Sequence, residues 1–365
     1  MKILVLSDGA SIHTERWLLG MKAAGVDFRK VSLITMNPEE VRNGISSEIL
    51  AENIYKISPG KIKIGGGNWI YLIYLLKIKF ISQKIKPDVI ISVYLTSYGF
   101  VASLIKGKTF LVHYMMGSDV MVALNKGWLY KITAKFSLWR ADMLVSASNT
   151  MTNKIKGFAA VDDSKVLTQQ YGLENWILLH GSKEKRYTFI SNRAWVKNSN
   201  IPYVLKLFEN AGPNRSLALV SSDNSQVDID TIKLLENSNI YLFNSMAHTK
   251  MVDLVSQSEY FFSLTSSDGT SLSLLEAMAV GCIPIVSDIP ANKEWVIDGY
   301  NGFLIDLFNE EKAIFKIREA LSLSEKEKKS IRQINKNIVD DRADCQRNMK
   351  LFYNKLQTLK QSCRC

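Results

Sequence analysis

The residues best suited to chemistry lie in a short polar segment, Ser266 to Ser271 (SSDGTS), between an apolar run and a helical pattern. The run YFFSLT predicts a buried strand and SLSLLEAMAVG predicts a helix, so the segment joins a strand end to a helix start. In open α/β sheets, ligands bind at this edge. Gly269 lets the backbone approach a ligand closely, and the free N–H groups at the helix start, where the helix dipole is positive, suit a diphosphate.

Further polar groups stand around the same junction. Thr270 and Ser271 offer hydroxyls, and Glu276 follows about a turn and a half into the predicted helix. A carboxylate at that position can accept hydrogen bonds from the vicinal hydroxyls of a ribose. The segment therefore predicts a site that holds a nucleotide diphosphate at both ends. A purely structural junction is the alternative, in which Asp268 caps the helix.

Alternating strands and helices surround this segment on both sides. The predicted strands of the first half are ILVLSDG, FRKVSLIT, PDVIISVYL, TFLVHYMMGSD and ADMLVSAS. Those of the second half are KRYTFISNR, SLALVSSD, NIYLFNS, YFFSLTSSD and CIPIVSD. Helical runs such as SIHTERWLLGMKAAG and IPYVLKLFENA separate them, and this alternation is typical of parallel, doubly wound α/β sheets.

The chain is long enough for two such domains. Glycines and a charged turn interrupt the pattern between residues 172 and 186, which predicts the crossover. We expect an N-terminal Rossmann-like domain over residues 1–175 and a second one over 186–320. The polar, helical residues 321–365 form a C-terminal extension that we expect to pack back toward the first domain.

The cysteines and the apolar runs indicate a cytoplasmic protein. Four cysteines give no paired disulfide framework. Cys363 and Cys365 have no Cys/His pair at ligand spacing nearby, so no metal site is predicted. The N-terminal run is too short for a signal peptide and predicts a strand. The longest apolar run, Asn68 to Ile81, contains Lys77 and Lys79 and falls short of the roughly 20 residues that span a membrane.

Positive charge is concentrated in the first half of the chain. The formal net charge is +11, and residues 1–165 hold 22 Lys/Arg against 12 Asp/Glu. No zinc finger, helix-turn-helix or aromatic RNP-like strand accompanies this charge, so a nucleic-acid partner is not predicted. An anionic membrane surface is the favoured partner. Gly60 to Pro87 contains six lysines, no acidic residue and several aromatics, which is typical of a segment in the headgroup layer. An ordinary helix with its lysines in water is the alternative.

Several motifs together resemble those of glycosyltransferase family 4. Asp268 and Glu276 are separated by seven residues within SDGTSLSLLEAMAVGCIPIVSD, and ANKEW and DGYNGFLI follow. DGASIHTERW, PDVIISVYLTSYGF, MMGSDV, QQYGLENW and ISNRAW extend the resemblance over most of the chain. The resemblance implies the GT-B fold, with two Rossmann-like domains that face a cleft, and retention of anomeric configuration. It also implies that no metal or other cofactor is needed beside the nucleotide sugar, which is a co-substrate.

The resemblance assigns the donor site to the second domain. Glu276 would bind the ribose hydroxyls, and Asp268, where the family usually has glutamate, would contact the donor sugar. Arg193 would stabilise the departing phosphate, with Lys197 a weaker candidate beside it. That Lys197 is simply a solvated surface lysine is an equally favoured alternative. Four main-chain N–H groups would bind the diphosphate, those of Gly269, Thr270, Ser271 and Leu272.

In the first domain, the turn after the first strand contains Gly9 and Ser11. In the family this loop approaches the donor phosphates and the acceptor. His13 and Arg16 follow at helical spacing and are cleft candidates, although a packing or capping function suits His13 equally well. Asp119 lies at another predicted strand end, where its carboxylate would orient a substrate hydroxyl during catalysis. His113, within the same strand, is a candidate that Asp119 outranks.

The subgroup that these motifs most resemble builds bacterial surface polysaccharides, such as O-antigen, capsule or exopolysaccharide. We therefore expect transfer of a hexose or N-acetylhexosamine from a nucleotide sugar to a lipid-linked oligosaccharide. A UDP-sugar is favoured, with GDP-mannose second. The enzyme would act in the cytoplasm, peripherally at the inner face of the cell membrane. A non-hydrolysing sugar-nucleotide epimerase and a non-catalytic sugar-nucleotide-binding subunit are the alternatives.

Overall fold

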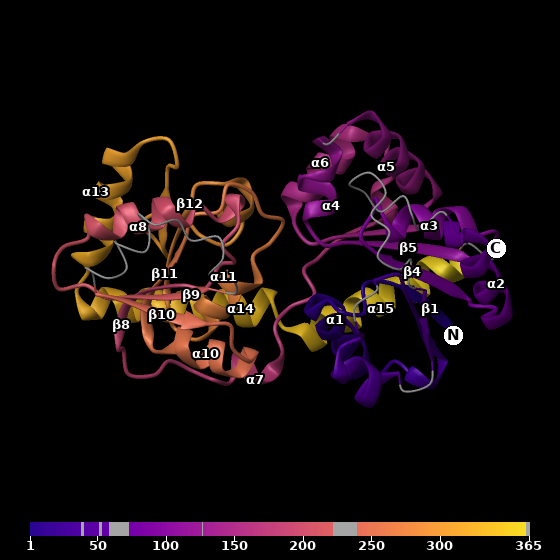
Figure 1. The fold of residues 1–365 in the computed structure, drawn as a ribbon, viewed down its shortest axis with the longest axis horizontal. Helices are drawn as coiled ribbons and strands as arrows, with labels where there is room; N and C mark the ends of the chain where they lie inside the picture. Colours follow the sequence, from indigo (N-terminus) through magenta and orange to yellow (C-terminus); the bar gives the residue numbers. More distant parts are fainter. Residues whose placement is uncertain (38–39, 51–52, 58–72, 126, 222–238, 363–365) are drawn as a thin grey trace. The chain divides into compact units, whose positions relative to one another are not determined.

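The computed structural model describes residues 1–37, 40–50, 53–57, 73–125, 127–221 and 239–362 (Figure 1). The chain divides into two compact units. Unit 1 consists of Met1–Tyr171 together with Cys345–Cys365, and unit 2 is Gly172–Asp344. The chain thus leaves unit 1 after Tyr171 and returns to it at Cys345.

Unit 1 is built on a seven-stranded sheet with the order β3-β2-β1-β4-β5-β6-β7. The strands are β1 (Ile3–Leu6), β2 (Val31–Thr35), β3 (Ile54–Lys56), β4 (Val89–Val93), β5 (Phe110–Met115), β6 (Met143–Ser146) and β7 (Val166–Thr168). Every neighbouring pair is parallel. In the register, Val5 pairs with Leu33 on one side and with Ile91 on the other. The central strands are buried throughout, as near-continuous apolar sequences in a doubly covered sheet require.

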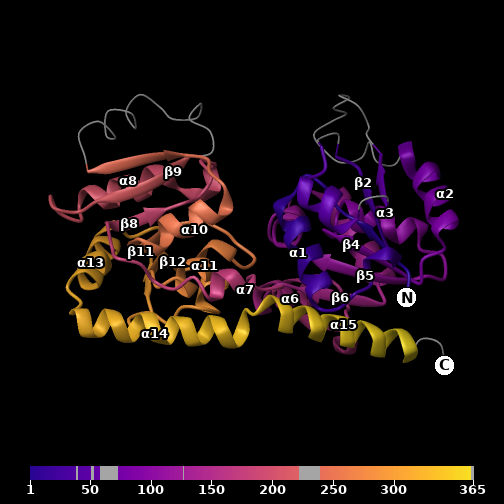
Figure 2. The ribbon, with the colours of Figure 1, turned by 90° about the horizontal axis from the view of Figure 1, so that it is seen from below.

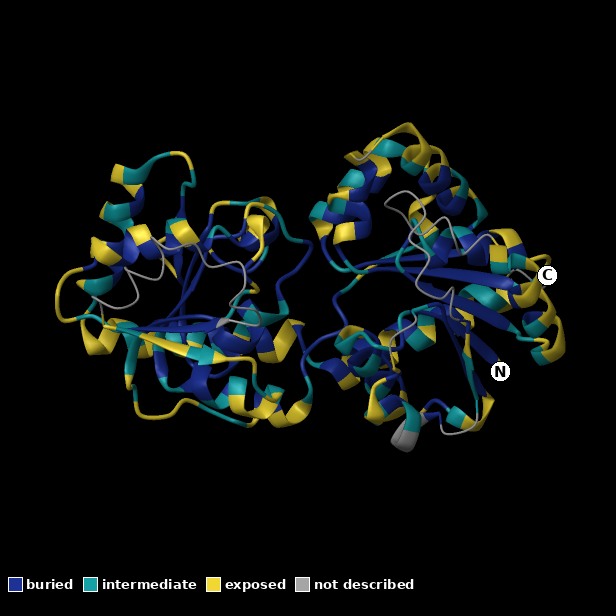
Figure 3. Cartoon of the chain, viewed as in Figure 1, coloured by how far each residue is buried: buried dark blue, intermediate teal, exposed yellow. Residues whose placement is uncertain are grey.

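The helices of unit 1 cover this sheet. They are α1 (Ile12–Ala23), α2 (Leu75–Ile85), α3 (Tyr98–Ile105), α4 (Ser118–Met121), α5 (Trp128–Arg140), α6 (Asn149–Phe158) and α15 (Cys345–Ser362). α3 packs against both α2 and α5. In Figure 3 the strands of the sheet are buried and the outer turns of α2 and α5 are exposed.

The C-terminal helix α15 packs on α1 within unit 1 (Figure 2). Trp17, Tyr114 and Phe352 form an edge-to-face aromatic cluster, with ring centroids 5.6–6.2 Å apart. A Cβ atom at Gly20 would lie only 2.6 Å from the Sγ atom of Cys345, so glycine permits this close approach. The last helix is therefore an integral part of the first Rossmann-like domain.

Unit 2 is built on a six-stranded parallel sheet with the order β10-β9-β8-β11-β12-β13. Its strands are β8 (Tyr187–Ser191), β9 (Leu217–Ser221), β10 (Ile240–Asn244), β11 (Ser258–Ser263), β12 (Ile283–Ser287) and β13 (Phe303–Ile305). Its helices are α7 (Asn175–Leu178), α8 (Ile201–Glu209), α10 (His248–Ser256), α11 (Leu272–Ala279), α12 (Pro290–Lys293), α13 (Glu310–Leu321) and α14 (Glu325–Arg342).

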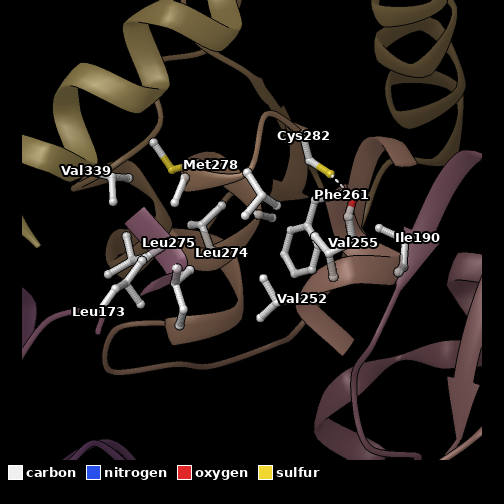
Figure 4. Close-up of a cluster of buried hydrophobic side chains, with 14 of the residues drawn as sticks. Leu173, Ile190, Val252, Val255, Phe261, Leu274, Leu275, Met278, Cys282 and Val339 are labelled. Carbon is white, nitrogen blue, oxygen red and sulfur yellow. Dashed lines mark hydrogen bonds between the residues drawn. The ribbon is translucent and has the colours of Figure 1, made fainter. Parts of the chain in front are cut away.

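One apolar core of unit 2 holds α11 against the sheet (Figure 4). Leu274, Leu275 and Met278 point from α11 into this core and are at most 1% exposed. The Sγ atom of Cys282 donates to the carbonyl oxygen of Val255 over 3.0 Å. This packing fixes the start of α11, and with it the segment that the sequence singles out.

Both predicted doubly wound domains are confirmed, but their limits differ from the expected ones. Unit 2 begins at Gly172 and runs to Asp344, whereas 186–320 was expected. The expected extension 321–365 is two separate helices. α14 packs against α11 and β12 in unit 2, with buried Asn335 bonded to Asn301, and α15 belongs to unit 1.

Two predicted features lie wholly or partly outside the described residues. Cys363 and Cys365 are among the residues left undescribed, as is the first part of the basic segment, up to residue 72. Its second part forms α2. Among the described residues, no helix is both long enough and apolar enough to cross a membrane.

Candidate active site

The middle of the unit 2 sheet brings two loops together. Strands β8 and β11 are neighbours, and from them the strand order runs outward in opposite directions, to β9 and to β12. The loops that leave their carboxyl ends therefore diverge, and such a topological switch point is where open α/β sheets bind ligands. Arg193 follows β8, and Asp268 follows β11.

Arg193, in the loop after β8, contacts the end of β11 and the loop that follows it. Its Nη2 atom donates to Oδ2 of Asp268 over 2.7 Å, and its Nε atom donates to Oγ of Ser263 over 2.8 Å. The side chains of Arg193 and Asp268 are 18% and 22% exposed. A guanidinium held by two fixed acceptors is oriented in advance, so it can stabilise negative charge without reorganising.

Two asparagines that sequence reasoning left without a function tie these loops together. Asn198 donates from Nδ2 to the carbonyl oxygen of Ser267 over 2.9 Å. Asn200 donates to the carbonyl oxygen of Leu264 and to Oγ of Ser266, over 2.7 and 2.8 Å. Lys197, the weaker candidate, is exposed on the same loop. The loop after β8 is thereby fixed against the loop after β11.

The start of α11 is capped by Ser271. Its Oγ atom accepts a hydrogen bond from the amide of Leu274 over 3.2 Å. The alternative in which Asp268 caps this helix is therefore wrong. Of the four amides expected to face a diphosphate, that of Gly269 donates to Oδ1 of Asp268 over 2.8 Å. The first amides of a helix lack intrahelical partners, so the start of α11 still presents donors to an anion.

Glu276 lies within α11 and contacts a histidine from another helix. His248, the first residue of α10, places Nε2 2.9 Å from Oε1 of Glu276, whose side chain is 6% exposed. Trp176 packs edge-on against His248, with ring centroids 5.4 Å apart. Sequence reasoning assigned His248 no function, because nothing in its spacing connects it with a residue 28 positions later.

The candidates of the first domain lie at the carboxyl edge of the unit 1 sheet. The amide of Gly9 donates to Oγ1 of Thr35 over 2.9 Å, and a Cβ atom at Gly9 would lie 2.9 Å from Val41. The expected contact between Gly9 and a donor phosphate is therefore wrong for its N–H group, which is buried and already bonded. Ser11 accepts from the amide of His13 as the N-cap of α1.

His13 and Arg16 lie on α1 in different surroundings. His13 is exposed, and its Nδ1 atom is 3.1 Å from the hydroxyl of Tyr171. Arg16 is only 6% exposed and is packed inside unit 1. Of the two cleft candidates, only His13 is open to a ligand.

Asp119 holds the ends of two strands together. Its carboxylate accepts from the amide of Leu95, after β4, over 2.7 Å, and from the amides of Met116 and Gly117, after β5, over 3.2 and 2.9 Å. Burial raises the pKa of Asp119, and these backbone amides act to lower it. With 5% exposure this aspartate is a structural tie, and its catalytic contact with a substrate hydroxyl stays a prediction.

His113 is a packing residue. It is fully buried, with Nδ1 2.6 Å from Oγ of Ser92 and Nε2 3.1 Å from both Oγ of Ser103 and the carbonyl oxygen of Ser137. The expectation that His113 contacts an acceptor is wrong, because the ring lies among β4, α3 and α5 beneath the surface.

The burial of His113 predicts a pH dependence of stability. Burial lowers the pKa of His113 from 6.5 to about 3. As the pH falls below 6.5 the unfolded chain takes up a proton that the folded chain does not, so stability is lost between pH 6.5 and about 3. From pH 7 to pH 5 this amounts to about 2 kcal/mol. Chemical denaturation of His113→Gln should show a correspondingly smaller loss. His13→Gln, at an exposed histidine, should keep the full loss, and equal losses in all three proteins would contradict the assignment.

Tyr94 is a further residue at this edge that sequence reasoning missed. It follows β4 with a φ of 77°, which is strained for a bulky residue. Burial raises the pKa of Tyr94, and Asp119 and Asp8 raise it further. Ser11 lies close enough to lower the pKa of Tyr94. The strain places a phenol beside Ser11, at the switch point between β1 and β4.

The described residues contain no group of three or more His, Cys, Asp or Glu side chains that could hold a metal ion. Arg193 and the helix start supply the positive potential at the unit 2 edge. That the reaction needs no cofactor stays a prediction.

Comparison with known proteins assigns both units. The family model described as "Glycosyl transferases group 1" matches residues 174–337, and the model described as "Glycosyl transferase 4-like" matches residues 2–148. The two matched ranges together span most of the chain. The protein is a glycosyltransferase of the family 4 type. No curated protein matches it significantly in sequence.

Solved structures agree with this glycosyltransferase in fold. The crystal structure of HepE from Anabaena in complex with UDP has a TM-score of 0.80 at 12% identity, over 98% of this chain and 100% of that one. Sucrose-phosphate synthase from Thermosynechococcus elongatus gives 0.79 at 13% identity, over 99% and 100%. A glycosyltransferase from Rickettsia africae gives 0.72 at 15% identity, over 99% and 98%. The glycosyltransferase therefore has the GT-B fold.

Proposed function

We propose that this glycosyltransferase binds its nucleotide-sugar donor at the carboxyl ends of β8 and β11. The observation that carries the proposal is the position of Arg193, bonded to Asp268 and Ser263 at the switch point of the unit 2 sheet. In this proposal the start of α11 and Arg193 bind the diphosphate, Glu276 binds the ribose, and Asp268 faces the donor sugar. The donor is a UDP-sugar, with GDP-mannose second. HepE supports this choice, since its structures were solved with UDP and with UDP-glucose.

The proposed reaction is a transfer with retention of configuration. The acceptor hydroxyl oxygen forms a bond with the anomeric carbon as the bond from that carbon to the diphosphate breaks. The hydroxyl proton passes to the departing diphosphate oxygen, so no protein nucleophile is required. Negative charge grows on the β-phosphate, and a preplaced guanidinium stabilises it.

The proposed acceptor is a sugar hydroxyl of a lipid-linked oligosaccharide in bacterial surface polysaccharide synthesis, and the transferred unit is a hexose or an N-acetylhexosamine. Such an acceptor resides at a membrane, which suits the excess of positive charge in residues 1–165. We accordingly place the enzyme at the inner face of the cell membrane as a peripheral protein. The family match favours this transfer over epimerisation or a purely binding function.

The experiment that tests the donor is a thermal-shift screen against a panel of UDP- and GDP-sugars. A ligand that binds only the folded chain raises the melting temperature. We expect a UDP-sugar to give the largest rise, and Glu276→Gln to diminish it. A panel in which no nucleotide sugar raises the melting temperature would contradict the proposal.

His248 provides a second test, because it contacts the proposed ribose ligand Glu276. His248→Ala removes one hydrogen bond to that carboxylate, worth about 0.5–1.5 kcal/mol, so the Kd for UDP should rise roughly 3- to 10-fold. His180→Ala is the matched control, since His180 packs on the same Trp176 ring while its Nε2 atom lies 3.5 Å from Oδ1 of Asp253. Calorimetric titration measures both. If the two variants bound UDP equally well, His248 would have no part in placing Glu276.

A further inference from the structure

Helix α5 presents an apolar face to the outside of unit 1. Trp128, Ile132 and Trp139 are 68%, 56% and 73% exposed. Spacings of four and eleven residues place all three on one side of a helix. The opposite side of α5 is buried, with Ala134 and Leu138 facing the core. Large apolar side chains that gather on one exposed face of a soluble domain mark an interaction surface.

Helix α2 repeats the pattern. Leu76 and Phe80 are 80% and 68% exposed and stand one helical turn apart. Ile78 and Ser82, on the other side, are buried. α2 therefore also packs one face and leaves an apolar stripe outside.

Helix α3 connects the two helices that carry these stripes. It packs against α2 and α5, and Phe100 of α3 lies edge-on to Phe136 of α5, with ring centroids 5.8 Å apart. We call the surface formed by Leu76, Phe80, Trp128, Ile132 and Trp139 the aromatic face. Figure 3 shows exposed residues along the outer turns of both flanking helices.

Exposed lysines lie beside the apolar side chains of the aromatic face. Lys77 and Lys79 flank the stripe on α2, and Lys131 and Lys135 flank it on α5; all four are exposed. Helices α2, α3 and α5 contain no Asp or Glu. The exposed lysines of α14 in unit 2, by contrast, alternate with Glu325, Glu327 and Asp340. Helices that carry exposed apolar side chains and lysines but no carboxylate match the headgroup layer of an anionic bilayer, in which lipid phosphates lie next to acyl chains.

We propose that the aromatic face binds an anionic lipid bilayer, with Trp128 and Trp139 in the headgroup layer. Tryptophan prefers this layer because its ring is largely apolar while its N–H group still reaches water. The lysines attract the anionic lipids, and each contributes near the surface. A second copy of the chain is a poorer occupant, because a symmetric contact would set the lysines of one face against those of the other.

The inference rests on the proposed function for its purpose, since a lipid-linked acceptor would have to be met at a membrane. It also assigns the membrane contact differently from the sequence. The basic segment Gly60–Pro87 is only partly involved, through α2, and α5 lies outside it altogether.

Co-sedimentation with vesicles tests the proposal on the full-length protein. The vesicles are phosphatidylcholine alone and phosphatidylcholine mixed with phosphatidylglycerol. We expect the wild type to sediment with the mixed vesicles and much less with the neutral ones. Trp128→Ser with Trp139→Ser should abolish sedimentation. Lys131→Glu with Lys135→Glu should weaken partitioning at least roughly 30-fold, because two attractive charges are lost and two repulsive ones added.

Leu351→Ser is the matched control. Leu351 is 50% exposed on α15, a helix that also contains lysines and no carboxylate but has no exposed tryptophan. This variant should sediment as the wild type does. The proposal would be overturned if the wild type did not sediment with the mixed vesicles, or if the tryptophan double variant sedimented with them as the wild type does. Gel filtration of the wild type that showed a dimer lost in the tryptophan double variant would likewise overturn it in favour of a second copy.

A parallel measurement separates this inference from the proposed function. Hydrolysis of the UDP-sugar in vesicle-free buffer should be the same for the wild type and the tryptophan double variant. Vesicle binding without any activity on nucleotide sugars would contradict the proposed function alone. Activity on nucleotide sugars without vesicle binding would contradict the membrane proposal alone.

Discussion

Arg193→Ala should lower turnover by about 10²–10³-fold, the cost of losing one preorganised group that stabilises transition-state charge. In our account the guanidinium acts most strongly when the bond to the diphosphate breaks. The Kd for UDP should consequently change far less than turnover. Release of UDP from the donor, followed at saturating donor and acceptor, measures the turnover.

Arg186→Ala is the matched control for this experiment. Arg186 is exposed just before the amino end of β8, whereas Arg193 follows the carboxyl end of the same strand. Removal of Arg186 should leave turnover unchanged. Arg193→Lys keeps the charge but loses the two-point contact with Asp268 and Ser263, so it should fall between the wild type and Arg193→Ala. Near-normal turnover of Arg193→Ala with donor binding intact would contradict the function assigned to this arginine.

Glu276→Gln should raise the Kd for UDP roughly 10- to 100-fold. The change removes the negative charge with little change of shape, and hydrogen bonds to a charged group contribute about 1.5–3 kcal/mol each. Turnover at saturating donor should be nearly unaffected, because the ribose is bound equally before and during the reaction. Calorimetric titration with UDP measures the effect. Glu311→Gln, at an exposed position of α13, should bind UDP as the wild type does.

The nucleotide supplies a second control for Glu276. The wild type should bind UDP more tightly than 2′-deoxy-UDP, and Glu276→Gln should bind the two almost equally. Such non-additivity is the signature of a direct contact. A variant that kept the full preference for UDP would show that Glu276 does not bind the 2′-hydroxyl.

The sequence predicted the long, buried elements of the fold well and the edges poorly. Strands such as β4 and β12 are continuous apolar runs, because both faces of a doubly wound sheet are covered. β3 and β7 are three-residue edge strands with only partial burial, and they leave no such run. The assignment of α14 to unit 2 depends on contacts such as that between Asn335 and Asn301, 34 positions apart.

In the candidate site, too, residues in local patterns could be predicted and contacts between distant segments could not. Arg193 and Asp268 each follow a recognisable strand, and Glu276 lies in the helix that comes directly after Asp268, so their places at one sheet edge could be expected. Partners from distant segments could not be. Nothing in the sequence links His248 with Glu276, or the amide of Leu95 with Asp119.

The structure corrected the predicted functions of two residues, His113 and Gly9, because it shows that both are buried. His113 is a single histidine in an otherwise apolar strand. Only the structure shows that its ring nitrogens lie within hydrogen-bonding distance of Ser92, Ser103 and Ser137 inside the unit. Gly9 was expected to approach a ligand, and instead it permits close packing against Val41.

The most direct test of the central claim is acceptor-dependent release of UDP. The purified protein is incubated with the UDP-sugar that stabilises it most, with and without a lipid-linked oligosaccharide, and free UDP is measured for the wild type beside Arg193→Ala. We expect the wild type to release more UDP when the acceptor is added, and we expect Arg193→Ala to release it about 10²–10³-fold more slowly. Conversion of the UDP-sugar to an isomer without acceptor, or release that is equal in the two proteins, would contradict it.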